Sequence, residues 1–496
     1  MHLETHISHI FLAGEYAYKL KKPVDFGFLD FTTPEKRRAA CAEEVRLNAR
    51  LAPDIYLGVV PVCHDQTGYH VRPQGCAAGE TEDEVLVHMR RFPQEGLLDH
   101  LATSGKLTAH IMTDIARQLA QFHATAARGP EIDRFGNLDS VREPVMQNFV
   151  QTRPYIGRTV SAAIHAHLRT WAEDFLHNHA GLFAERVHAG KIVDGHGDLH
   201  LRNMCKIDGR VLIFDCIEFN PALRAGDVMN DIAFLIMDLD HRALAAHANR
   251  FLNEYLEQTR DYAGLKLLDF YRFYRACVRA KVLSFESDTA PASGRRAVEQ
   301  EAASYFDLAE QVLTPRAPGL LITCGVSGSG KTTLAHQAAE MLDAVMVRSD
   351  AVRKHLAGIP LTTRGTESGI DIYTSSMTSR TYEALLQHAR EVIASGRWAI
   401  LDAVYGKKSE RAAAAALARE QRVPFGVLYC KAPQTELKRR LDQRAIEGRD
   451  ISDATVTVLE QQLTRFETPV PDEGPQFSWT GKENPETWLA SLRARR

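Results

Sequence analysis

The chain has 496 residues, too many for one compact core, because a domain typically takes about 150 residues. Apolar residues make up 45% and charged residues 25% of the sequence, which excludes a disordered or fibrous chain. The formal net charge is -3, from 60 Lys and Arg against 63 Asp and Glu. The chain therefore lacks the overall basic charge typical of proteins that bind long nucleic acids or anionic membranes.

The eight cysteines are scattered, and no two of them form a Cys-x-x-Cys pair. This spacing predicts neither a zinc site nor a disulfide framework, and we expect reduced thiols. No apolar run approaches the roughly 18 residues needed to span a bilayer, and the first residues do not resemble a secretory signal. The sequence therefore predicts a soluble, cytoplasmic protein with no membrane partner, and it leaves the oligomeric state open.

The first 313 residues divide into a small part, about 1–92, and a larger part, about 93–313. The small part contains strand-like and helical segments at 8–13, 16–21, 34–51 and 85–89. The larger part is mostly helical in pattern, with two short apolar runs near residues 192 and 212. The pattern predicts a small mixed lobe followed by a helical lobe.

A seam at residues 314–319 contains two prolines and a glycine, which end a helix and cannot extend a central strand. An apolar strand at 320–324 follows directly, and strands and helices then alternate. This alternation is typical of a parallel sheet with crossover helices. We therefore expect an α+β two-lobed domain over residues 1–313, a linker over 314–319 and an α/β domain over 320–496.

A polar motif lies around the two apolar runs of the helical lobe. Residues His196 to Asn203 match His-x-Asp-x-x-x-x-Asn, and Asp215 ends the second run. Phosphoryl transfer needs a carboxylate at the acceptor hydroxyl and further oxygen ligands for Mg²⁺. Asp198 suits the first task, and Asn203 and Asp215 suit the second. The alternative is a hairpin with polar loop residues and a structural histidine.

This motif resembles the aminoglycoside phosphotransferase and choline kinase branch of the protein-kinase fold, which carries His-Gly-Asp where protein kinases carry His-Arg-Asp. The resemblance implies an ATP site in the small lobe. There, residues 16–19 are similar to the strand that ends in the phosphate-binding lysine, which nominates Lys19. The helix after it would supply the ion-pair partner, Glu44 rather than Glu43. A solvent-facing lysine strand is the alternative for Lys19.

The small lobe departs from this family in one respect. A single hairpin turning at Gly14 precedes Lys19, whereas the fold needs three strands there. We expect the first strand and its nucleotide-covering loop to be short or absent. A weakened or regulatory kinase lobe is therefore a second interpretation.

Two further features of the helical lobe bear on the acceptor. In the resembled branch, carboxylates after Asp215 meet a cationic acceptor such as an aminoglycoside or choline, and helix N-capping is the alternative. A later segment, residues 271–281, is rich in aromatic and basic residues. We expect it to pack in the core with a basic outer face rather than to form a substrate-binding site. The carboxylates concerned are Glu218, Asp227, Asp231, Asp238 and Asp240.

After the seam, residues 325–332 match Gly-x-x-x-x-Gly-Lys-[Ser/Thr] between an apolar strand and a helical run. Glycines let main-chain N–H groups surround phosphate oxygens, Lys331 would reach the terminal phosphates, and Thr332 would ligate Mg²⁺. The motif predicts a nucleotide phosphate site. Its expected ligands are Gly325, Ser327, Gly328, Ser329, Gly330, Lys331 and Thr332.

Acidic residues end the next two strand-like runs, at Asp350 and Asp402. Ligands bind beyond the carboxyl ends of parallel strands. We expect Asp350 to accept the proton of an acceptor hydroxyl and Asp402 to hold the Mg²⁺ water shell, with strand-end caps as the alternative. Arg440 and Arg444, on a predicted helix, are expected to form a lid over the migrating phosphoryl group, with a solvated basic face as the alternative.

The motifs over residues 318–470 resemble the small P-loop kinases, a group that includes polynucleotide 5′-kinases, zeta-toxin-like sugar-nucleotide kinases and gluconate-kinase-like enzymes. Together the two halves resemble bacterial fusions of an aminoglycoside phosphotransferase-like domain with such a kinase. The resemblance implies a protein-kinase-like domain followed by a P-loop domain. It further implies a bifunctional phosphotransferase that uses ATP and Mg²⁺ and acts on small hydroxylated metabolites. Two alternatives remain: a P-loop half that acts on short nucleic-acid ends or sugar nucleotides, and a nucleotide-gated regulator.

Overall fold

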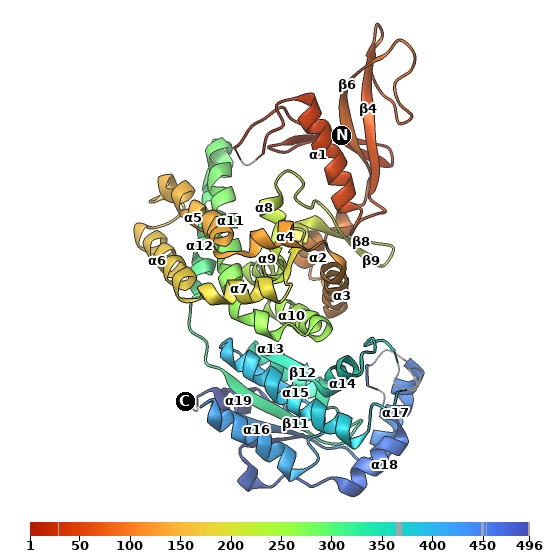
Figure 1. The fold of residues 1–496 in the computed structure, drawn as a ribbon, viewed down its shortest axis with the longest axis vertical. Coiled ribbons are helices and arrows are strands. Elements are labelled where there is room, and N and C mark those ends of the chain that lie inside the picture. The colour runs from red at the N-terminus through yellow and green to blue at the C-terminus, as the bar shows by residue number, and fades with distance from the viewer. Residues whose placement is uncertain (28, 364–369, 448–450, 453, 495–496) are drawn as a thin grey trace. The chain divides into compact units, whose positions relative to one another are not determined.

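A computed structural model describes the chain in two compact units (Figure 1). The first unit comprises Met1–Ala243 and Leu267–Leu313, and the second comprises Leu244–Lys266 and Thr314–Arg496. The residues described are 1–27, 29–363, 370–447, 451–452 and 454–494. Among these residues, no helix combines the length and the apolar character needed to cross a membrane.

The first unit begins with an antiparallel sheet in the strand order β1-β2-β3-β6-β4-β5, against which α1 (Pro34–Asn48) packs. Residues alternate between buried and less buried along β3, so Lys19 and Lys21 lie on one face. Thr33 caps α1 by accepting a hydrogen bond from the main-chain N–H of Lys36. The strands are β1 (His2–Glu4), β2 (Ser8–Ala13), β3 (Tyr16–Lys21), β4 (Tyr56–Asp65), β5 (Gly68–Val71) and β6 (Thr81–Arg90).

Strand β1 is present but only three residues long, and residues 5–7, which include no glycine, connect it to β2. The first strand is therefore shortened, as the single hairpin before Lys19 predicts.

The rest of the first unit is mainly helical, with two short strand pairs, β7 with β10 and β8 with β9. Its strands are β7 (Ile192–Asp194), β8 (Met204–Ile207), β9 (Arg210–Ile213) and β10 (Ala225–Asp227). Its helices are α2 (Leu98–Thr103), α3 (Ala109–Thr125), α4 (Pro130–Asp133), α5 (Leu138–Thr152), α6 (Ala162–Asn178), α7 (Ala180–His188), α8 (Pro221–Arg224), α9 (Val228–His241), α11 (Leu265–Thr289, whose first two residues fall in the second unit) and α12 (Ala292–Val312).

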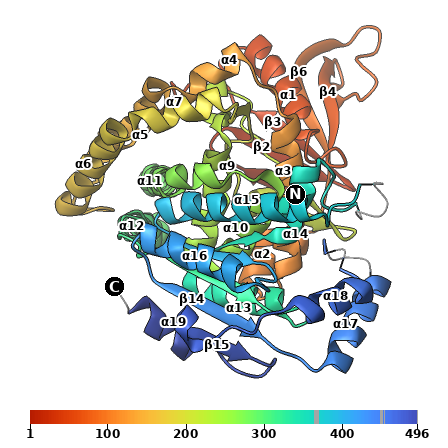
Figure 2. The same cartoon turned by 60° about the horizontal axis from the view of Figure 1, so that its bottom comes forward.

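The second unit contains a wholly parallel sheet in the order β12-β13-β11-β14-β15. Every residue of β11 is buried, as expected for a parallel strand covered on both faces. Figure 2 shows α13 and α19 beside β14 and β15. The strands are β11 (Gly319–Cys324), β12 (Val345–Arg348), β13 (Trp398–Asp402), β14 (Phe425–Cys430) and β15 (Gln476–Trp479). The helices are α10 (Ala245–Thr259), α13 (Lys331–Leu342), α14 (Ser349–Ala357), α15 (Ser375–Ala394), α16 (Lys408–Glu420), α17 (Gln434–Glu447), α18 (Val456–Arg465) and α19 (Glu486–Arg493).

Helix α10 groups with the P-loop unit, although the sequence division at residue 313 assigns it to the first domain. It lies along β12, the edge strand of the sheet. Asn253 Oδ1 accepts a hydrogen bond from the main-chain N–H of Met346 at 2.6 Å, and Asn249 and Asn253 each donate to the carbonyl of Ala344 at 3.0 Å. These amides satisfy main-chain groups that an edge strand leaves unpaired.

A disulfide joins Cys63 in β4 to Cys76 in the β5–β6 connection, with the Cα atoms 5.6 Å apart. The expectation of reduced thiols throughout is therefore wrong for this pair. The hairpin of β4 and β5 and the connection after it bring together two residues that are 13 apart in the sequence, which a search for close Cys spacing does not detect. The other cysteines that the structure describes are free and buried.

Candidate active sites

Lys19 lies between two carboxylates in the first unit. Its Nζ is 2.9 Å from Glu44 Oε1 and 3.1 Å from Asp215 Oδ1. The Lys19 side chain is 11% exposed and that of Glu44 is fully buried, which excludes a solvent-facing lysine. Burial opposes ionisation of Glu44, but Lys19 and Lys21 lower the pKa of its carboxyl to about 2. The structure therefore brings together the three residues that the motif comparison nominates.

A second lysine, Lys21, belongs to the same network and was not selected from the sequence. Its buried Nζ lies 2.7 Å from Glu44 Oε2 and also pairs with Glu218. The alternation of the strand residues 16–21 places Lys19 and Lys21 on one face, which is the signal that could have found it. Glu218 itself offers no local signal, since it is 197 residues from Lys21.

The loop after β7 places Asp198 beside Asn203 and His200. Asn203 Nδ2 donates to Asp198 Oδ2 at 2.7 Å, and His200 Nε2 lies 3.3 Å from the same oxygen. Burial alone would raise the pKa of Asp198, but the charge and hydrogen bond of His200, with the charge of Arg279, hold it below its usual value. The carboxylate is therefore ionised at neutral pH, and its side chain is 31% exposed.

Asp215 is the third residue, after Asp198 and Asn203, that the sequence nominates for phosphoryl transfer in the first unit. It follows β9 rather than ending it. Its φ of 62° is in the left-handed region, and its main-chain N–H donates to the hydroxyl of Tyr56 at 3.3 Å. This turn directs the carboxylate towards Lys19 on the sheet. Asp215 thus contacts the sheet of the small lobe, while the main-chain N–H of the preceding residue, Phe214, donates to the carbonyl of Asn203.

Asp231, in the first turn of α9, anchors the loop that leads to Asp198. It accepts hydrogen bonds from the main-chain N–H groups of His196 and Gly197, both at 2.8 Å, and lies 3.3 Å from His123 Nε2. A Cβ at Gly195 would lie 2.4 Å from Asp231 Oδ2. Gly195, which directly precedes the motif, therefore allows the close approach of the loop to the helix.

The carboxylates after Asp215 are all engaged by protein groups, so they do not form an acidic surface for a cationic acceptor. The N-cap alternative is correct for Asp227, whose side chain accepts from the main-chain N–H of Met229. The engaged pairs are Glu218 with Lys21, Asp227 with Arg186, Asp231 with His123, Asp238 with Arg242 and Asp240 with Arg272.

Replacing Asp231 with asparagine is expected to reduce the free energy of unfolding by about 3 kcal/mol at pH 7, since it breaks a buried charged network. Burial opposes ionisation, but His123 and the loop donors hold the Asp231 pKa at about 2. Because this pKa is below that of the unfolded chain, the stabilisation exists above about pH 4 and is lost as the pH falls towards 2. Urea unfolding from pH 7 to pH 3 measures both effects. The variant should show a flatter acid limb, and the exposed control Asp307→Asn should follow the wild type; equal acid limbs would contradict the prediction.

The second unit places the P-loop threonine against the expected metal carboxylate. Thr332 Oγ1 donates to Asp402 Oδ2 at 2.7 Å, and Thr323 Oγ1 lies 3.0 Å from Asp402 Oδ1. This contact follows from topology, because β13 pairs in parallel with β11 and both strands end at the P-loop edge of the sheet. Lys331 Nζ donates to the carbonyl of Val326 at 3.0 Å, within the loop.

The loop glycines lie where side chains would not fit. Gly328 and Gly330 have φ values of 82° and 93°. A Cβ at Gly328 would lie 2.9 Å from the carbonyl of Leu437, and one at Gly330 would lie 2.5 Å from the Trp479 ring. The buried Ser329 Oγ has no hydrogen-bond partner among the described residues. The loop therefore has the compact form and the polar interior that a phosphate group requires.

The remaining residues nominated in this unit lie around the same edge. Asp350 is in the first turn of α14, because β12 ends two residues earlier, at Arg348. Arg440 donates from Nη1 to the carbonyl of Gly328 at 3.2 Å and from Nε to Glu436 at 2.7 Å. Arg444 lies one turn further along α17. The acceptor role of Asp350 and the lid role of the arginines remain predictions.

Arg348 connects helix α10 to the P-loop centre, a link that no local sequence signal indicates. Its Nε lies 3.8 Å from Asp402 Oδ2, and its Nη1 lies 3.4 Å from Glu257 Oε2 on α10. The main-chain carbonyl of Glu257 also lies 2.8 Å from His355 Nε2 on α14. Glu257 therefore contacts both β12 and α14.

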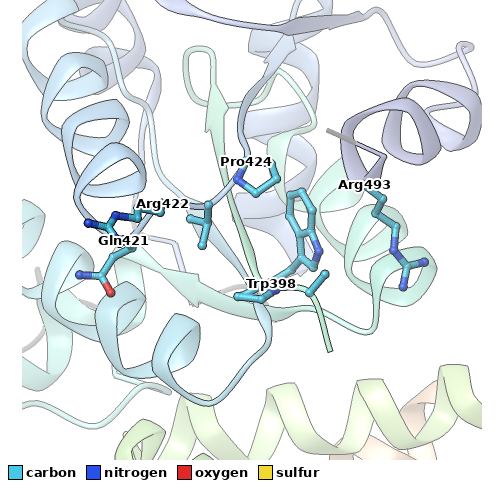
Figure 3. A pocket seen from close by; sticks show the side chains of 8 residues that line it. Trp398, Gln421, Arg422, Pro424 and Arg493 are labelled. Carbon is cyan, nitrogen blue, oxygen red and sulfur yellow. The ribbon is translucent and has the colours of Figure 1, made fainter. Parts of the chain in front are cut away.

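A shallow cavity of about 510 Å³ in the second unit lies away from these groups (Figure 3). Apart from Arg493 at the end of α19, its residues precede or begin β11, β13 and β14, and since the strands are parallel, it lies at the amino edge of the sheet, opposite the P-loop. It is therefore no part of the phosphate site. Its lining residues are Ala317, Pro318, Trp398, Gln421, Arg422, Val423, Pro424 and Arg493.

Two family models match the chain, one in each half. The model described as "Phosphotransferase enzyme family" matches residues 26–268, and the model described as "AAA domain" matches residues 320–469. The predictions of a fusion of two kinase-type domains, of a kinase-like α+β domain followed by a parallel-sheet P-loop domain, and of an enzyme of the phosphotransferase class are confirmed.

Among solved structures, the chain is similar to a choline kinase from Cryptosporidium parvum Iowa II, with 10% identity over 63% of this chain and 88% of that chain and a TM-score of 0.37. It is also similar to a gluconokinase from Sinorhizobium meliloti 1021, with 22% identity over 36% of this chain and 89% of that chain and a TM-score of 0.23.

Curated relatives match almost the whole chain. These are the uncharacterized proteins Rv2004c and MT2060 of Mycobacterium tuberculosis and Mb2027c of Mycobacterium bovis. Each is 32% identical over 467 residues, which cover 94% of this chain and 90% of the relative. The match runs through both halves and the seam, so the chain belongs to the family of these mycobacterial proteins, a fusion of a phosphotransferase-family domain with a P-loop kinase-type domain.

Proposed function

We propose that the protein is a bifunctional phosphotransferase that moves the γ-phosphate of ATP to hydroxyl groups of small metabolites, with one centre in each unit. The observation that carries this proposal is the arrangement around Lys19, which lies within 3.1 Å of both Glu44 and Asp215. Phosphoryl transfer in the protein-kinase fold requires this lysine–glutamate pair together with a metal-binding aspartate. The compact loop beside Asp402 gives the second unit a phosphate site of its own.

In the first unit, Asp198 accepts the proton of the acceptor hydroxyl while Lys19 binds ATP phosphate oxygens. The oxygen donors there suit Mg²⁺, since Asn203 turns its amide nitrogen to Asp198 and keeps Oδ1 for a cation, and Asp215 supplies a carboxylate. Mg²⁺ would neutralise phosphate charge and orient the γ-phosphate. The residues of this chain supply proton transfer and positioning.

In the second unit, the main-chain N–H groups of the P-loop and Lys331 bind the phosphates. Thr332 and Asp402 form an oxygen-donor pair, 2.7 Å apart, that suits Mg²⁺ directly or through water. Asp350 accepts the acceptor proton, and Arg440 and Arg444 stabilise the charge of the migrating group.

A regulatory first unit is the second candidate, and the three-residue strand β1 favours it. The connection from β1 to β2 is too short to extend over a nucleotide as a glycine-rich loop does. On this candidate the first unit would bind nucleotide without transferring phosphate.

Release of ADP separates the two candidates. We would measure it for the full chain, Asp198→Ala and Lys331→Ala with sugars, sugar acids, amino alcohols, nucleosides and 5′-hydroxyl oligonucleotides. The bifunctional proposal expects the two variants to lose different acceptors. If Asp198→Ala alters no acceptor while the chain still binds ATP, the first unit is regulatory. Turnover of oligonucleotides lost only in Lys331→Ala would identify a nucleic-acid kinase in the second unit.

Replacing Glu257 with glutamine is expected to raise the Mg²⁺ concentration needed for half-maximal nucleotide binding about three- to fivefold, equivalent to about 1 kcal/mol for one ion pair. Without Glu257, the Arg348 charge is offset less and acts more strongly on Asp402, where it competes with the cation. Titration calorimetry with an ATP analogue at varied Mg²⁺ measures the shift.

The double variant Glu257→Gln, Arg348→Gln should restore the Mg²⁺ dependence, because it removes the competing charge. The control Glu340→Gln changes an exposed carboxylate on α13 and should leave it unaltered. An unchanged Mg²⁺ dependence in Glu257→Gln would contradict the role given to α10.

A further inference from the structure

Helix α11 carries two arginines without a carboxylate partner, Arg275 and Arg279. They are four residues apart and therefore share one face of the helix. Arg275 Nε donates to Asn230 Oδ1 at 2.8 Å and its guanidinium lies 4.8 Å from the centre of the Phe234 ring. Arg279 lies over the ring of Tyr305 at 5.7 Å. Within the described part of the chain, neither has Asp or Glu at ion-pair distance, in contrast to Arg272 one turn earlier, which pairs with Asp240 and Asp269.

This cationic face adjoins the loop after β7, residues 195–203, which carries Asp198. The Phe234 ring is 5.4 Å from the His200 ring, and His200 Nε2 is 3.3 Å from Asp198 Oδ2. Arg279 is close enough for its charge to contribute to the lowered pKa of Asp198. Helices α9 and α11 both belong to the helical part, whereas Lys19 lies on strand β3 of the sheet and Glu44 lies on helix α1.

A partly buried guanidinium without a counter-ion is unfavourable. Burial lowers the pKa of Arg279, but Tyr305 and Asp198 more than offset the effect, so the side chain stays charged. In the proposed reaction, Asp198 accepts the hydroxyl proton. It therefore does not remain a negatively charged partner of Arg279. An anionic group on a ligand would offset the desolvation of Arg279 through charge-assisted hydrogen bonds.

The opposite case, a cationic acceptor, lacks binding groups. The carboxylates after Asp215 each pair with a lysine, arginine or histidine of the protein, and Asp231 and Asp238 also accept main-chain N–H groups of the loop after β7. A cation beside Asp198 would meet Arg279 and His200 rather than a cluster of carboxylates.

We propose that the acceptor of the first unit is an anion, a small hydroxylated metabolite whose phosphate or carboxylate group binds Arg279 while its hydroxyl faces Asp198. This inference rests on the proposed function of that unit. The hydroxyl oxygen forms a bond to the γ-phosphorus as the bond from that phosphorus to the β–γ bridging oxygen breaks. The hydroxyl proton passes to Asp198, and ADP leaves. Arg275, 4% exposed, contacts no ligand and raises the positive potential at this face.

Matched acceptors test the proposal in the full chain carrying Lys331→Ala, which silences the second unit. One set is glucose, gluconate, glucose 6-phosphate and glucosamine, and another is glycerol, glycerate, glycerol 3-phosphate and ethanolamine. Release of ADP that depends on Asp198 should occur with the anionic members of each set. Comparison of the phosphate with the carboxylate in each set shows which of these two anionic groups the site prefers. Preference for a neutral or cationic member overturns the proposal.

Adding Arg279→Gln should raise KM for the anionic acceptor at least tenfold, with kcat within about threefold and KM for ATP unchanged, and Arg279→Lys should recover part of the loss. The control Arg296→Gln removes an exposed charge from α12 and should leave KM unaltered. An equal KM in Arg279→Gln overturns the proposal.

Inorganic phosphate provides a readout that needs no acceptor. In the Lys331→Ala chain saturated with a non-hydrolysable ATP analogue, phosphate should raise Tm, and Arg279→Gln should abolish this rise. Suppose that no acceptor gives Asp198-dependent turnover but the phosphate effect depends on Arg279. The proposed transfer activity of the first unit is then rejected, and the proposed anion site at Arg279 is supported. If the phosphate effect is the same in both chains, the anion site is rejected.

Discussion

Asp198→Asn should lower acceptor-dependent ADP release by the first unit about 10²–10⁴-fold, the range that a positioned general base contributes. Asparagine has the same shape and can still accept the hydrogen bond that Asn203 donates at 2.7 Å, so the loop should keep its geometry. What the variant loses is the ability to take the hydroxyl proton. KM for ATP should therefore change little, because Lys19 and Glu44 are untouched.

Steady-state kinetics with the best acceptor of the first unit measure this loss. Asp208→Asn provides a matched control, since Asp208 is an exposed carboxylate in the β8–β9 turn with a φ of 49° that asparagine tolerates. A decrease of less than about tenfold in Asp198→Asn would show that no proton acceptor acts at this position. A parallel decrease in thermal stability would show that the loop has shifted.

The parts of both centres that could be predicted are those that the chain brings together locally. The P-loop is one continuous segment between a strand and a helix, and Asp198 and Asn203 are separated by only five residues. Asp402 was predictable because a carboxylate at the end of a parallel strand must lie at the edge where ligands bind. Lys19 and Glu44 needed the resemblance to a known fold as well, since 25 residues separate them.

The parts that could not be predicted depend on contacts between distant residues. Glu218 reaches Lys21 across 197 residues, and Glu257 reaches Arg348 across 91. Neither pair leaves a periodic pattern in the sequence. Helix α10 has the amphipathic pattern of any surface helix, so nothing local indicates that it packs along β12, which lies far from it in the sequence, rather than on the helices beside it in the chain.

The carboxylates after Asp215 show that a count of acidic residues in the sequence does not reveal which of them are paired with basic residues in the structure. Counted from the sequence, they form an acidic cluster that fits a cationic acceptor. In the structure their charges are neutralised within the protein, and two of them, Asp231 and Asp238, hold the loop of residues 196–201 in place by accepting main-chain N–H groups. Near Asp198, Arg275 and Arg279 have no carboxylate at ion-pair distance, which is the basis for proposing an anionic rather than a cationic acceptor.

Lys331→Ala should lower phosphoryl transfer by the second unit about 10²–10³-fold, the loss found when one preorganised donor to transition-state charge is removed. The lysine has one hydrogen bond here, to the carbonyl of Val326 in its own loop, so its removal should leave Tm within about 1 °C of the wild type. The exposed Lys438, which pairs with Glu460 on the neighbouring helix, gives the control Lys438→Ala. Kinetics with an acceptor of the second unit measure the effect, and the activity lost in Asp198→Asn should be retained. Loss of both activities in Lys331→Ala would instead mean that the two centres act as one, with nucleotide in the P-loop required for transfer at Asp198.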